Sequence, residues 1–568
     1  MPNQTVCKER ILSEDYMDFI INYQNPDFTN EVPILQQCVQ RGGFGYETIY
    51  LSRADAMPLR LENYPYNSIP KCYGLLDMEA LNQAGITQIQ NYPTLQLKGE
   101  NVMIGFIDTG IDYQNQVFRH LDGSTRIAGI WDQTIQKGVP PQGLFYGSEY
   151  STEKINEALQ SDISKEEVPT MDENGHGTFL ASVAAGSANV DARFLGAAPE
   201  STIGVVKLKQ AKQYLKDFYF IKESAIAYQE NDIIMGIHYL DTLAQAKNMP
   251  LVICIALGTN LGGHTASSPL GIVLDRMANA RNRVVVIGGG NEANQRHHYS
   301  NEISSTKERK EMEIRVGSQE QGFTLEIWAD IPNLFAVSIV SPSGEKIPRI
   351  PIKQNSSAVY SFVFEQTQVY VDYRLLVQKT NSQLIYFRFA RPTAGIWKIV
   401  MEPVQLSDGI FHAWLPMKEF QKGEIYFIES NPYYTITEPS SSISPITVAC
   451  ENGNENSIDI NSGRGYTRNR GVKPDFAAPG VSVTGAVPGG RFTERTGSSV
   501  AVGIAGGACA LMLEWVVYQL GNSGVDSVQI KNLLILGAIR KPNEPYPNRE
   551  WGYGSMNLYH TFEVLRTY

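Results

Sequence analysis

The pattern of apolar and polar positions changes character along the chain. Between residues 100 and 300, apolar runs such as "NVMIGFID", "STIGVVKL", "PLVICIAL" and "RVVVIGGG" alternate with segments of helical spacing, such as "GHGTFLASVAAG" and "NDIIMGIHYLDTLAQAK". Apolar runs of this kind are typical of strands buried on both faces, and their alternation with helices is typical of a parallel sheet covered on both sides. This region is therefore predicted to be an α/β domain.

Residues 305–436 show a second pattern, which predicts an all-β domain. Runs such as "FTLEIWADI", "LIYFRFARP" and "GIWKIVMEP" alternate with period two, and Pro, Gly, Ser and Asn separate them. This combination is typical of a β-sandwich or jelly roll. The α/β pattern returns after residue 437 with "SPITVACE". We therefore expect a jelly-roll-like domain at 305–436, inserted between two halves of the α/β domain at 68–304 and 437–568.

The N-terminal residues 1–67 mix helical and strand-like patterns and predict a small α+β unit. They run into "LENYPYNSIPKCYG", whose prolines and turn formers indicate a boundary. The opening residues "MPNQTVCKERILSEDY" are polar and lack the apolar centre of a secretory signal. The chain is therefore expected to be made in the cytoplasm.

Length and charge limit the classes of function. The 568 residues are enough for several domains and a large core. A net charge of −11 argues against nucleic acid as the main partner, because such a partner requires a clustered basic surface. Neither an EF-hand spacing nor a C-x-x-C pair is present, so no metal ligand and no cofactor are predicted.

Six cysteines are scattered along the chain without close pairs. In a chain of this length, that distribution favours free thiols made in a reducing compartment over a disulfide framework. The cysteines are Cys7, Cys38, Cys72, Cys254, Cys450 and Cys509.

The stretch "TGSSVAVGIAGGACALML" contains no charge and allows two interpretations. Its length is at the short end for a membrane span. Its glycines make it only weakly hydrophobic, however, and Glu514 interrupts the apolar run. A helix that is apolar on all sides is more often buried in the core of a large protein. We therefore predict a core helix and no membrane span.

Three short motifs carry the candidate chemistry. Asp108 ends the apolar run of "VMIGFIDTGID", His176 lies between two glycines before a helix, and Ser499 lies at the start of the small-residue helix. Each alone has a simpler interpretation as a turn or cap residue. Together they supply a hydroxyl nucleophile, an imidazole to take its proton and a carboxylate to orient the imidazole.

The blocks "GFIDTGID", "NGHGTFLASVAAG" and "TGSSVAVGIAGG" resemble, in this order, the three signature blocks of subtilisin-like serine proteases. The resemblance implies a three-layer α/β core with a parallel sheet. It also implies that Asp108 orients the imidazole, that His176 is the general base and then the general acid, and that Ser499 is the nucleophile. The chain departs from the family pattern at Ser498, where threonine is usual, and at Val502, where proline is usual.

Two further segments resemble the substrate cleft of this family. "VVVIGGGNEAN" resembles the oxyanion segment, which makes Asn291 the side-chain donor to the developing oxyanion. "CIALGTN" resembles the strand that lines the specificity pocket. The substrate-binding residues implied by these segments are Leu257, Gly258, Gly288, Gly289 and Gly290.

The jelly-roll-like insertion narrows the resemblance to the clostridial Csp germination proteases and their relatives. That resemblance implies that residues 1–67 are a prodomain, which assists folding and lies as an inhibitor in the active-site cleft. It predicts self-cleavage between Ser52 and Gly74, with a second candidate site after Gln96. It also implies incorporation into the spore and limited proteolysis of a protein substrate, a cortex-lytic pro-hydrolase.

Two other functions compete with this interpretation. A pseudoprotease that acts as a binding or signalling module would have degenerate catalytic residues, whereas all of them are present here. A carbohydrate-binding protein would use Trp328, Trp397 and Trp414 of the β-domain to stack on sugars, although aromatic residues at strand spacing are usually core. The β-domain itself is either a rigid clamp against the core or a docking surface for a substrate protein or a sibling subunit.

Overall fold

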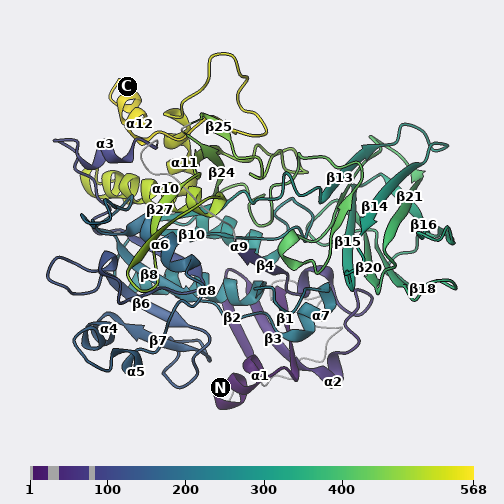
Figure 1. Cartoon of the computed structure of the whole chain (residues 1–568), viewed down its shortest axis with the longest axis horizontal. Helices are drawn as coiled ribbons and strands as arrows, with labels where there is room; N and C mark the ends of the chain where they lie inside the picture. The colour runs from purple at the N-terminus through teal and green to yellow at the C-terminus, as the bar shows by residue number, and fades with distance from the viewer. Residues whose placement is uncertain (1–3, 23–37, 76–83, 454, 568) are drawn as a thin grey trace.

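A nine-stranded, mostly parallel sheet forms the centre of the molecule in this computed structural model, which describes residues 4–22, 38–75, 84–453 and 455–567. The strand order is β25-β24-β12-β10-β5-β8-β6-β7, and β26 pairs with β24 beside this path (Figure 1). Neighbours from β24 to β6 run parallel, whereas β25 and β7 run antiparallel to their neighbours. The predicted α/β core is thus confirmed. Its strands are β5 (Met103–Asp108), β6 (Ile127–Asp132), β7 (Ser148–Ser151), β8 (Thr202–Lys207), β10 (Leu251–Ile255), β12 (Arg283–Gly288), β24 (Ile446–Asn452), β25 (Ser457–Ile458) and β26 (Phe476–Pro479).

Helices cover both faces of the sheet and complete three layers. Strand β10 shows why the apolar runs lack polar residues. Val252 and Cys254 join the apolar cluster beneath α6 and α10, whereas Ile253 and Ile255 join the cluster beneath α8 and α9. Successive side chains of a strand point to opposite faces, and here both faces are buried. The helices are α3 (Ile86–Gln90), α4 (Thr152–Leu159), α5 (Ser164–Glu167), α6 (His176–Ala185), α7 (Gln213–Tyr219), α8 (Glu230–Ala246), α9 (Pro269–Ala278), α10 (Ser498–Leu513), α11 (Ser527–Leu536) and α12 (Leu558–Leu565).

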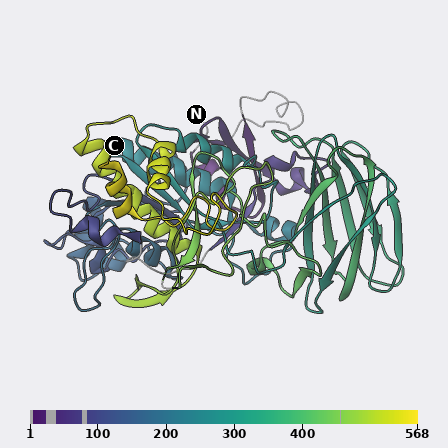
Figure 2. The same cartoon turned by 90° about the horizontal axis from the view of Figure 1, so that it is seen from above.

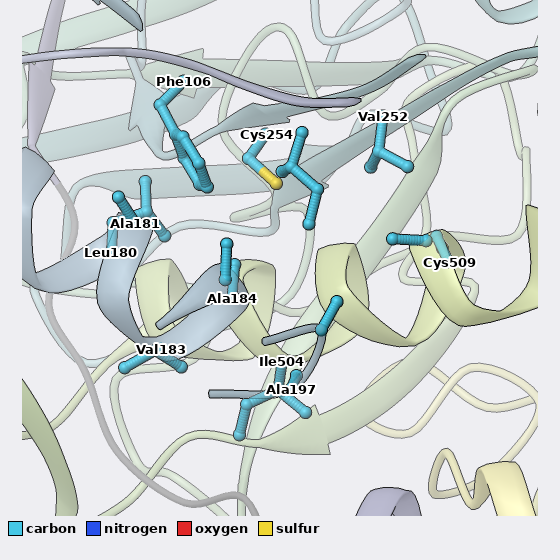
Figure 3. Packing of buried hydrophobic residues seen from close by; sticks show 14 of the residues in the cluster. Phe106, Leu180, Ala181, Val183, Ala184, Ala197, Val252, Cys254, Ile504 and Cys509 are labelled. Atoms are coloured by element: carbon cyan, nitrogen blue, oxygen red, sulfur yellow. The ribbon is translucent and has the colours of Figure 1, made fainter. Parts of the chain in front are cut away.

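Helix α10 packs against the sheet beside Cys254 (Figure 3), and glycines of the helix lie at this contact. A Cβ atom added to Gly506 would lie 2.4 Å from Cys254 Sγ, and one added to Gly507 would lie 2.3 Å from Ala197 Cβ. Among the described residues, the helical stretch Ser498–Gln519 is the one long and apolar enough to cross a membrane, but 89% of its most apolar window is buried inside the protein. Its composition therefore serves packing against the sheet.

Two antiparallel sheets form the β-domain at one end of the molecule (Figure 2). Their inner faces enclose a separate apolar cluster, as expected for an all-β insertion. The six-stranded sheet contains β13 (His298–Glu302), β22 (Ile410–Trp414), β15 (Gly322–Asp330), β20 (Ser382–Ala390), β19 (Gln368–Arg374) and β18 (Ser356–Ser361), in this order. The five-stranded sheet contains β17 (Lys346–Ile350), β16 (Leu334–Val340), β21 (Gly395–Gln405), β14 (Lys310–Val316) and β23 (Ile425–Phe427).

The tryptophans proposed for sugar stacking are all buried. Trp328 and Trp397 are 0% exposed and Trp414 is 2% exposed. Trp328 and Trp414 instead join a cluster that also contains residues of the N-terminal unit and of α7. These rings cannot stack on a sugar without unfolding their surroundings, which removes the basis of the carbohydrate-binding interpretation.

The N-terminal unit is a small α+β structure that packs against the core. Its sheet has the order β1-β3-β2, and Ile20, Tyr46 and Tyr50 belong to the same apolar cluster as α8. Asp18 is fully buried beneath this sheet, where its carboxylate accepts hydrogen bonds from Lys212 of the core and from Gln229 Nε2 at 2.7 Å. The elements are α1 (Gln4–Leu12), β1 (Tyr16–Asn22), β2 (Val39–Gly43), β3 (Tyr46–Ser52) and α2 (Arg53–Ala56).

One prediction about the cysteines is wrong. Cys7 in α1 and Cys38 before β2 form a disulfide, with their Cα atoms 5.2 Å apart. The other four cysteines are buried thiols outside this disulfide, as expected. The two bonded cysteines are 31 residues apart in the sequence. Their proximity is created by the packing of α1 against the N-terminal sheet, which the spacing of cysteines does not reveal.

Buried polar groups join the β-domain to the rest of the molecule. Arg468 of the core forms an ion pair with Asp330 of β15, with 2.6 Å between Nη1 and Oδ1. Tyr66 of the N-terminal segment donates a hydrogen bond to Glu326 of β15 at 2.7 Å, and burial raises the pKa of this carboxyl. The ring of His264 of the core stacks on the ring of Trp414, with 4.0 Å between the ring centroids. Burial lowers the pKa of His264 to about 4. These contacts support the interpretation of the β-domain as a clamp.

We expect Gly506→Leu to lower the free energy of unfolding by about 3 kcal/mol or more, because the new side chain must displace Cys254 and the strand that carries it. Urea unfolding measures this change. Two control variants should each change the free energy of unfolding by less than about 1 kcal/mol. They are Ser499→Ala, which removes one oxygen, and Gly524→Leu, at an exposed turn where the nearest neighbour of an added Cβ is 3.6 Å away. Equal stability of Gly506→Leu and the controls would contradict the packing argument.

Candidate active site

Three elements end or begin at one edge of the central sheet. Strand β5 ends at Asp108, helix α6 begins at His176, and helix α10 begins at Ser498. In an open parallel sheet, functional groups gather outside the carboxyl ends of the strands, because the loops there come from neighbouring strands. The structure therefore brings together three residues that lie up to 391 positions apart in the sequence, since 499 − 108 = 391.

The side chains of Asp108, His176 and Ser499 form a hydrogen-bonded series. His176 Nδ1 lies 2.8 Å from Asp108 Oδ1, and His176 Nε2 lies 3.1 Å from Ser499 Oγ. Asp108 and Ser499 are fully buried and His176 is 4% exposed. The Thr109 N–H also donates to Asp108 Oδ1 at 2.7 Å, which fixes the carboxylate. This geometry allows a proton to pass from the hydroxyl to an imidazole whose orientation is held by a carboxylate.

Asp172 connects the segment that carries Asp108 to the segment that carries His176. The sequence analysis did not identify this residue. Its Oδ1 accepts hydrogen bonds from Thr109 Oγ1 and from the Gly175 N–H, both at 2.8 Å. Its Oδ2 accepts from the Thr178 N–H at 2.8 Å and from the Thr178 hydroxyl at 2.7 Å. The carboxylate thereby ties the turn after β5 to the first turn of α6. The sequence feature that could have pointed to it is an acidic residue four positions before His176.

Two glycines permit the close approach of these segments. A Cβ added to Gly177 would lie 2.2 Å from the Gly110 carbonyl oxygen and 3.2 Å from Asp108 Cβ. Gly497, which precedes α10, has a φ of 143°, a conformation that side chains with a Cβ rarely adopt. The first glycine brings the imidazole to the carboxylate, and the second turns the chain so that Ser499 faces the imidazole.

Asn291 lies beside the start of α10 and completes an anion-binding arrangement. Its Oδ1 accepts a hydrogen bond from the Ser498 N–H at 3.2 Å. Within the described part of the chain, neither Asn291 Nδ2 nor the Ser499 N–H donates a hydrogen bond. Two donors at a helix N-terminus, next to the nucleophilic hydroxyl, are suited to a developing negative charge on a carbonyl oxygen.

A strand of the chain itself pairs with the segment that is predicted to line the substrate cleft. Strand β4 (Cys72–Leu75) lies between β11 (Leu257–Gly258) and β9 (Tyr228–Gln229), antiparallel to both. The register pairs Leu75 with Leu257 and Gly74 with Gly258. Both predicted residues of this wall therefore bind backbone, as in β-strand addition. The opposite strand β9 was not foreseen, because two residues leave no periodic signal.

The three predicted glycines, at the end of β12 and directly after it, form a second wall that leads to Asn291. The Gly288 carbonyl accepts a hydrogen bond from Ser440 Oγ at 2.6 Å, and the Gly289 carbonyl accepts one from the Thr437 N–H at 3.1 Å. Gly290 has a φ of 93°, which is favourable for glycine alone. The residues predicted for the cleft thus lie on two segments, one that pairs with β4 and one that leads to Asn291.

The direction of β4 shows which end of it faces Ser499. Strand β11 follows β10 in the chain, and its N-to-C direction points away from the carboxyl edge of the sheet. Because β4 is antiparallel to β11, the N-to-C direction of β4 points toward that edge. Leu75 is consequently nearer to Ser499 than Cys72 is. The second candidate cleavage site lies elsewhere. Lys98 and Gly99, just after Gln96, donate backbone hydrogen bonds to Glu514, fifteen residues beyond Ser499 and roughly 22 Å away along the helix.

Comparison with known proteins agrees with this geometry. The model of the subtilase family matches residues 99–404 and 422–554. The solved structure of the CspB protease of Clostridium perfringens is similar over 86% of this chain and 99% of that chain, with a TM-score of 0.76 and 28% sequence identity. No curated protein matches the chain significantly.

We expect Gly177→Ala to break the contact between Asp108 and His176, because the added methyl group must push away the Gly110 carbonyl. An imidazole N–H that donates to a buried carboxylate gives a proton NMR signal far downfield. The signal of His176, which is distinguished from that of His297 beside Glu292 by its loss in His176→Gln, should be present in the wild type and absent in Gly177→Ala. Gly524→Ala, at an exposed turn, serves as the control and should retain it. A retained signal in Gly177→Ala would contradict the packing argument.

Proposed function

The chain belongs to the subtilase family of serine peptidases, and on that premise we propose that it is an endopeptidase that cuts its own N-terminal segment and then performs limited proteolysis. One observation carries the proposal. The side chains of Asp108, His176 and Ser499 form a hydrogen-bonded series, and an extended strand of the chain, β4, pairs with the predicted cleft residues Leu257 and Gly258.

In the proposed reaction, Ser499 Oγ attacks the carbonyl carbon of the scissile bond and forms a C–O bond. His176 Nε2 takes the hydroxyl proton, and Asp108 stabilises the resulting imidazolium through the Nδ1 hydrogen bond. The C–N bond then breaks, and His176 returns the proton to the leaving amine. Water repeats the sequence on the acyl-enzyme, with His176 again as base and then acid, and regenerates Ser499.

Asn291 and the Ser499 N–H would stabilise the charge that develops on the carbonyl oxygen. The bond from the Ser498 N–H to Asn291 Oδ1 orients the side chain so that its NH₂ group is the free end. In subtilisin itself, one such donor contributes about 10²–10³ in rate. Because the donors are fixed before substrate binds, no reorganisation is needed during the reaction.

The pairing of β4 supports a cut close to this strand. An extended chain held between two strands presents its backbone to the nucleophile in the manner of a substrate. Since Leu75 is the end of β4 nearer to Ser499, the scissile bond would follow it directly. The bond would then join Leu75 to residue 76, just past the predicted range of Ser52 to Gly74, and residues 76–83 lie outside the described residues.

Residues 1–67 would act as the prodomain. The N-terminal sheet is bound to the core through the apolar cluster of α8 and through the buried Asp18, so it is held independently of the strand in the groove. Such a unit would stabilise the neighbouring core during folding, and the tail that follows it would lie in the cleft as an inhibitor.

Mass spectrometry of the purified full chain tests the self-cleavage. We expect the wild type to consist of two fragments, with the new N-terminus within a few residues of Leu75, and Ser499→Ala to remain one intact chain. Loss of the nucleophile should leave the fold unchanged by circular dichroism. An intact wild-type chain whose Ser499 reacts with a fluorophosphonate would overturn self-processing. An intact chain without such reactivity would favour a pseudoprotease.

We further propose that the mature enzyme is incorporated into the spore and activates a cortex-lytic pro-hydrolase by limited proteolysis. The support is the similarity, over nearly the whole of that chain, to the CspB protease. A narrow groove that binds its occupant as a β-strand also favours cleavage within extended, exposed segments of a folded substrate over general digestion.

Incubation with extracts of spore proteins tests this role. We expect new N-termini, identified by terminal labelling and mass spectrometry, to be few and to include one between the pro-segment and the catalytic part of a cortex hydrolase. The Ser499→Ala protein, as the matched control, should produce none of them. Cleavage of many unrelated proteins, or of no cortex hydrolase, would contradict the germination role.

A further inference from the structure

The side chain of Thr437 fills the space between the two walls of the substrate groove. A Cβ added to Gly258, on the wall that pairs with β4, would lie 2.6 Å from Thr437 Oγ1. A Cβ added to Gly290, on the opposite wall, would lie 2.6 Å from Thr437 Cγ2 and 2.7 Å from Oγ1. One side chain therefore contacts both glycine segments at once. Thr437 therefore occupies the space that the two glycine segments would otherwise leave open.

The space between Gly258 and Gly290 lies where a substrate side chain must enter. The carbonyl that Ser499 attacks has to reach Asn291, the residue after Gly290. The strand that carries this carbonyl is also the continuation of β4, which is held beside Leu257 and Gly258. The side chain of the residue before the scissile bond, the P1 residue, consequently starts between the two glycine segments and points toward Thr437.

Thr437 is held firmly in this position. It is fully buried, its N–H donates to the Gly289 carbonyl at 3.1 Å, and its carbonyl accepts from the Ser440 N–H at 2.9 Å. Its Oγ1 has no hydrogen-bond partner among the described residues. A buried hydroxyl without a partner is unfavourable for stability. The hydroxyl is thus not explained by the packing of the core.

We infer that Thr437 determines the P1 specificity of the proposed peptidase by shortening the pocket, so that short side chains are accepted and aromatic ones are rejected. This inference rests on the proposed function and adds a substrate class to it. An aromatic ring would have to occupy the volume that the threonine methyl and hydroxyl groups already fill between Gly258 and Gly290.

The acidic neighbour Glu438 does not make the pocket selective for basic residues. It faces away from the groove, since a Cβ on Gly262 would lie 3.2 Å from its Cγ. Its carboxylate accepts hydrogen bonds from the Thr265 N–H at 3.0 Å and from Ser441 Oγ at 2.6 Å. Burial also raises its pKa, which favours the neutral form. Size, not charge, is therefore the selecting property.

The test uses self-cleavage of the full chain, timed during cell-free synthesis after translation is stopped. The P1 residue, once mapped, is replaced by Ala and by Phe in four backgrounds: wild type, Thr437→Val, Thr437→Ala and Thr437→Gly. Valine keeps the volume of threonine without its hydroxyl. We expect the Phe substrate to be cut at least about 10-fold more slowly than the Ala substrate in the wild type and in Thr437→Val. The ratio should fall through Thr437→Ala and approach one or reverse in Thr437→Gly.

Using a ratio of two substrates separates specificity from structural damage, because a poorly folded variant slows both equally. If the wild type cuts Phe as fast as Ala, or if the ratio is the same in Thr437→Gly as in the wild type, the inference is overturned while the proposed peptidase stands. If no background cuts any substrate and Ser499 does not react with a fluorophosphonate, the proposed function itself fails and the inference fails with it.

Discussion

The close packing of helix α10 against the central sheet is the constraint on which the active site depends. Gly506 and Gly507 have neighbours at distances that exclude any side chain, so the helix axis is fixed relative to β10 and to the segment that carries Ala197. Ser499 is at the first turn of this helix, two turns before the contact. Its distance to His176, which belongs to a helix on the same face, is therefore set by backbone packing and not by the flexible side chains themselves.

The remaining parts of the site use the same principle of fixing polar groups with buried contacts. Asp172 joins the segments of Asp108 and His176, and the Ser498 N–H orients Asn291. Each catalytic group is thus positioned before a substrate arrives, which reduces the reorganisation needed in the transition state. The cleft admits shorter side chains than its glycine walls alone would allow, because Thr437 occupies the space beside Gly258 and Gly290.

The N-terminal unit and the β-domain extend this arrangement beyond the core. The segment that leads into β4 contains Tyr66, whose hydroxyl donates a hydrogen bond to the buried Glu326 of the β-domain. The N-terminal sheet that precedes this segment is bound to the core through Asp18. Three regions of the chain therefore share one continuous interface, in which polar groups are paired within an apolar cluster. These contacts fix the β-sandwich, which is inserted between Asn291 and Ser499, against the rest of the molecule.

The sequence by itself determined the layers of the core, the all-β insertion and the three motif residues, because each is encoded by a local period or a short pattern. It did not determine the disulfide between Cys7 and Cys38, the pairing of β4 with β9, or the position of Thr437 between Gly258 and Gly290. Those contacts join segments that are distant in sequence, and no periodicity records them. Only the tertiary structure decides such contacts, because they arise from how completed elements pack together.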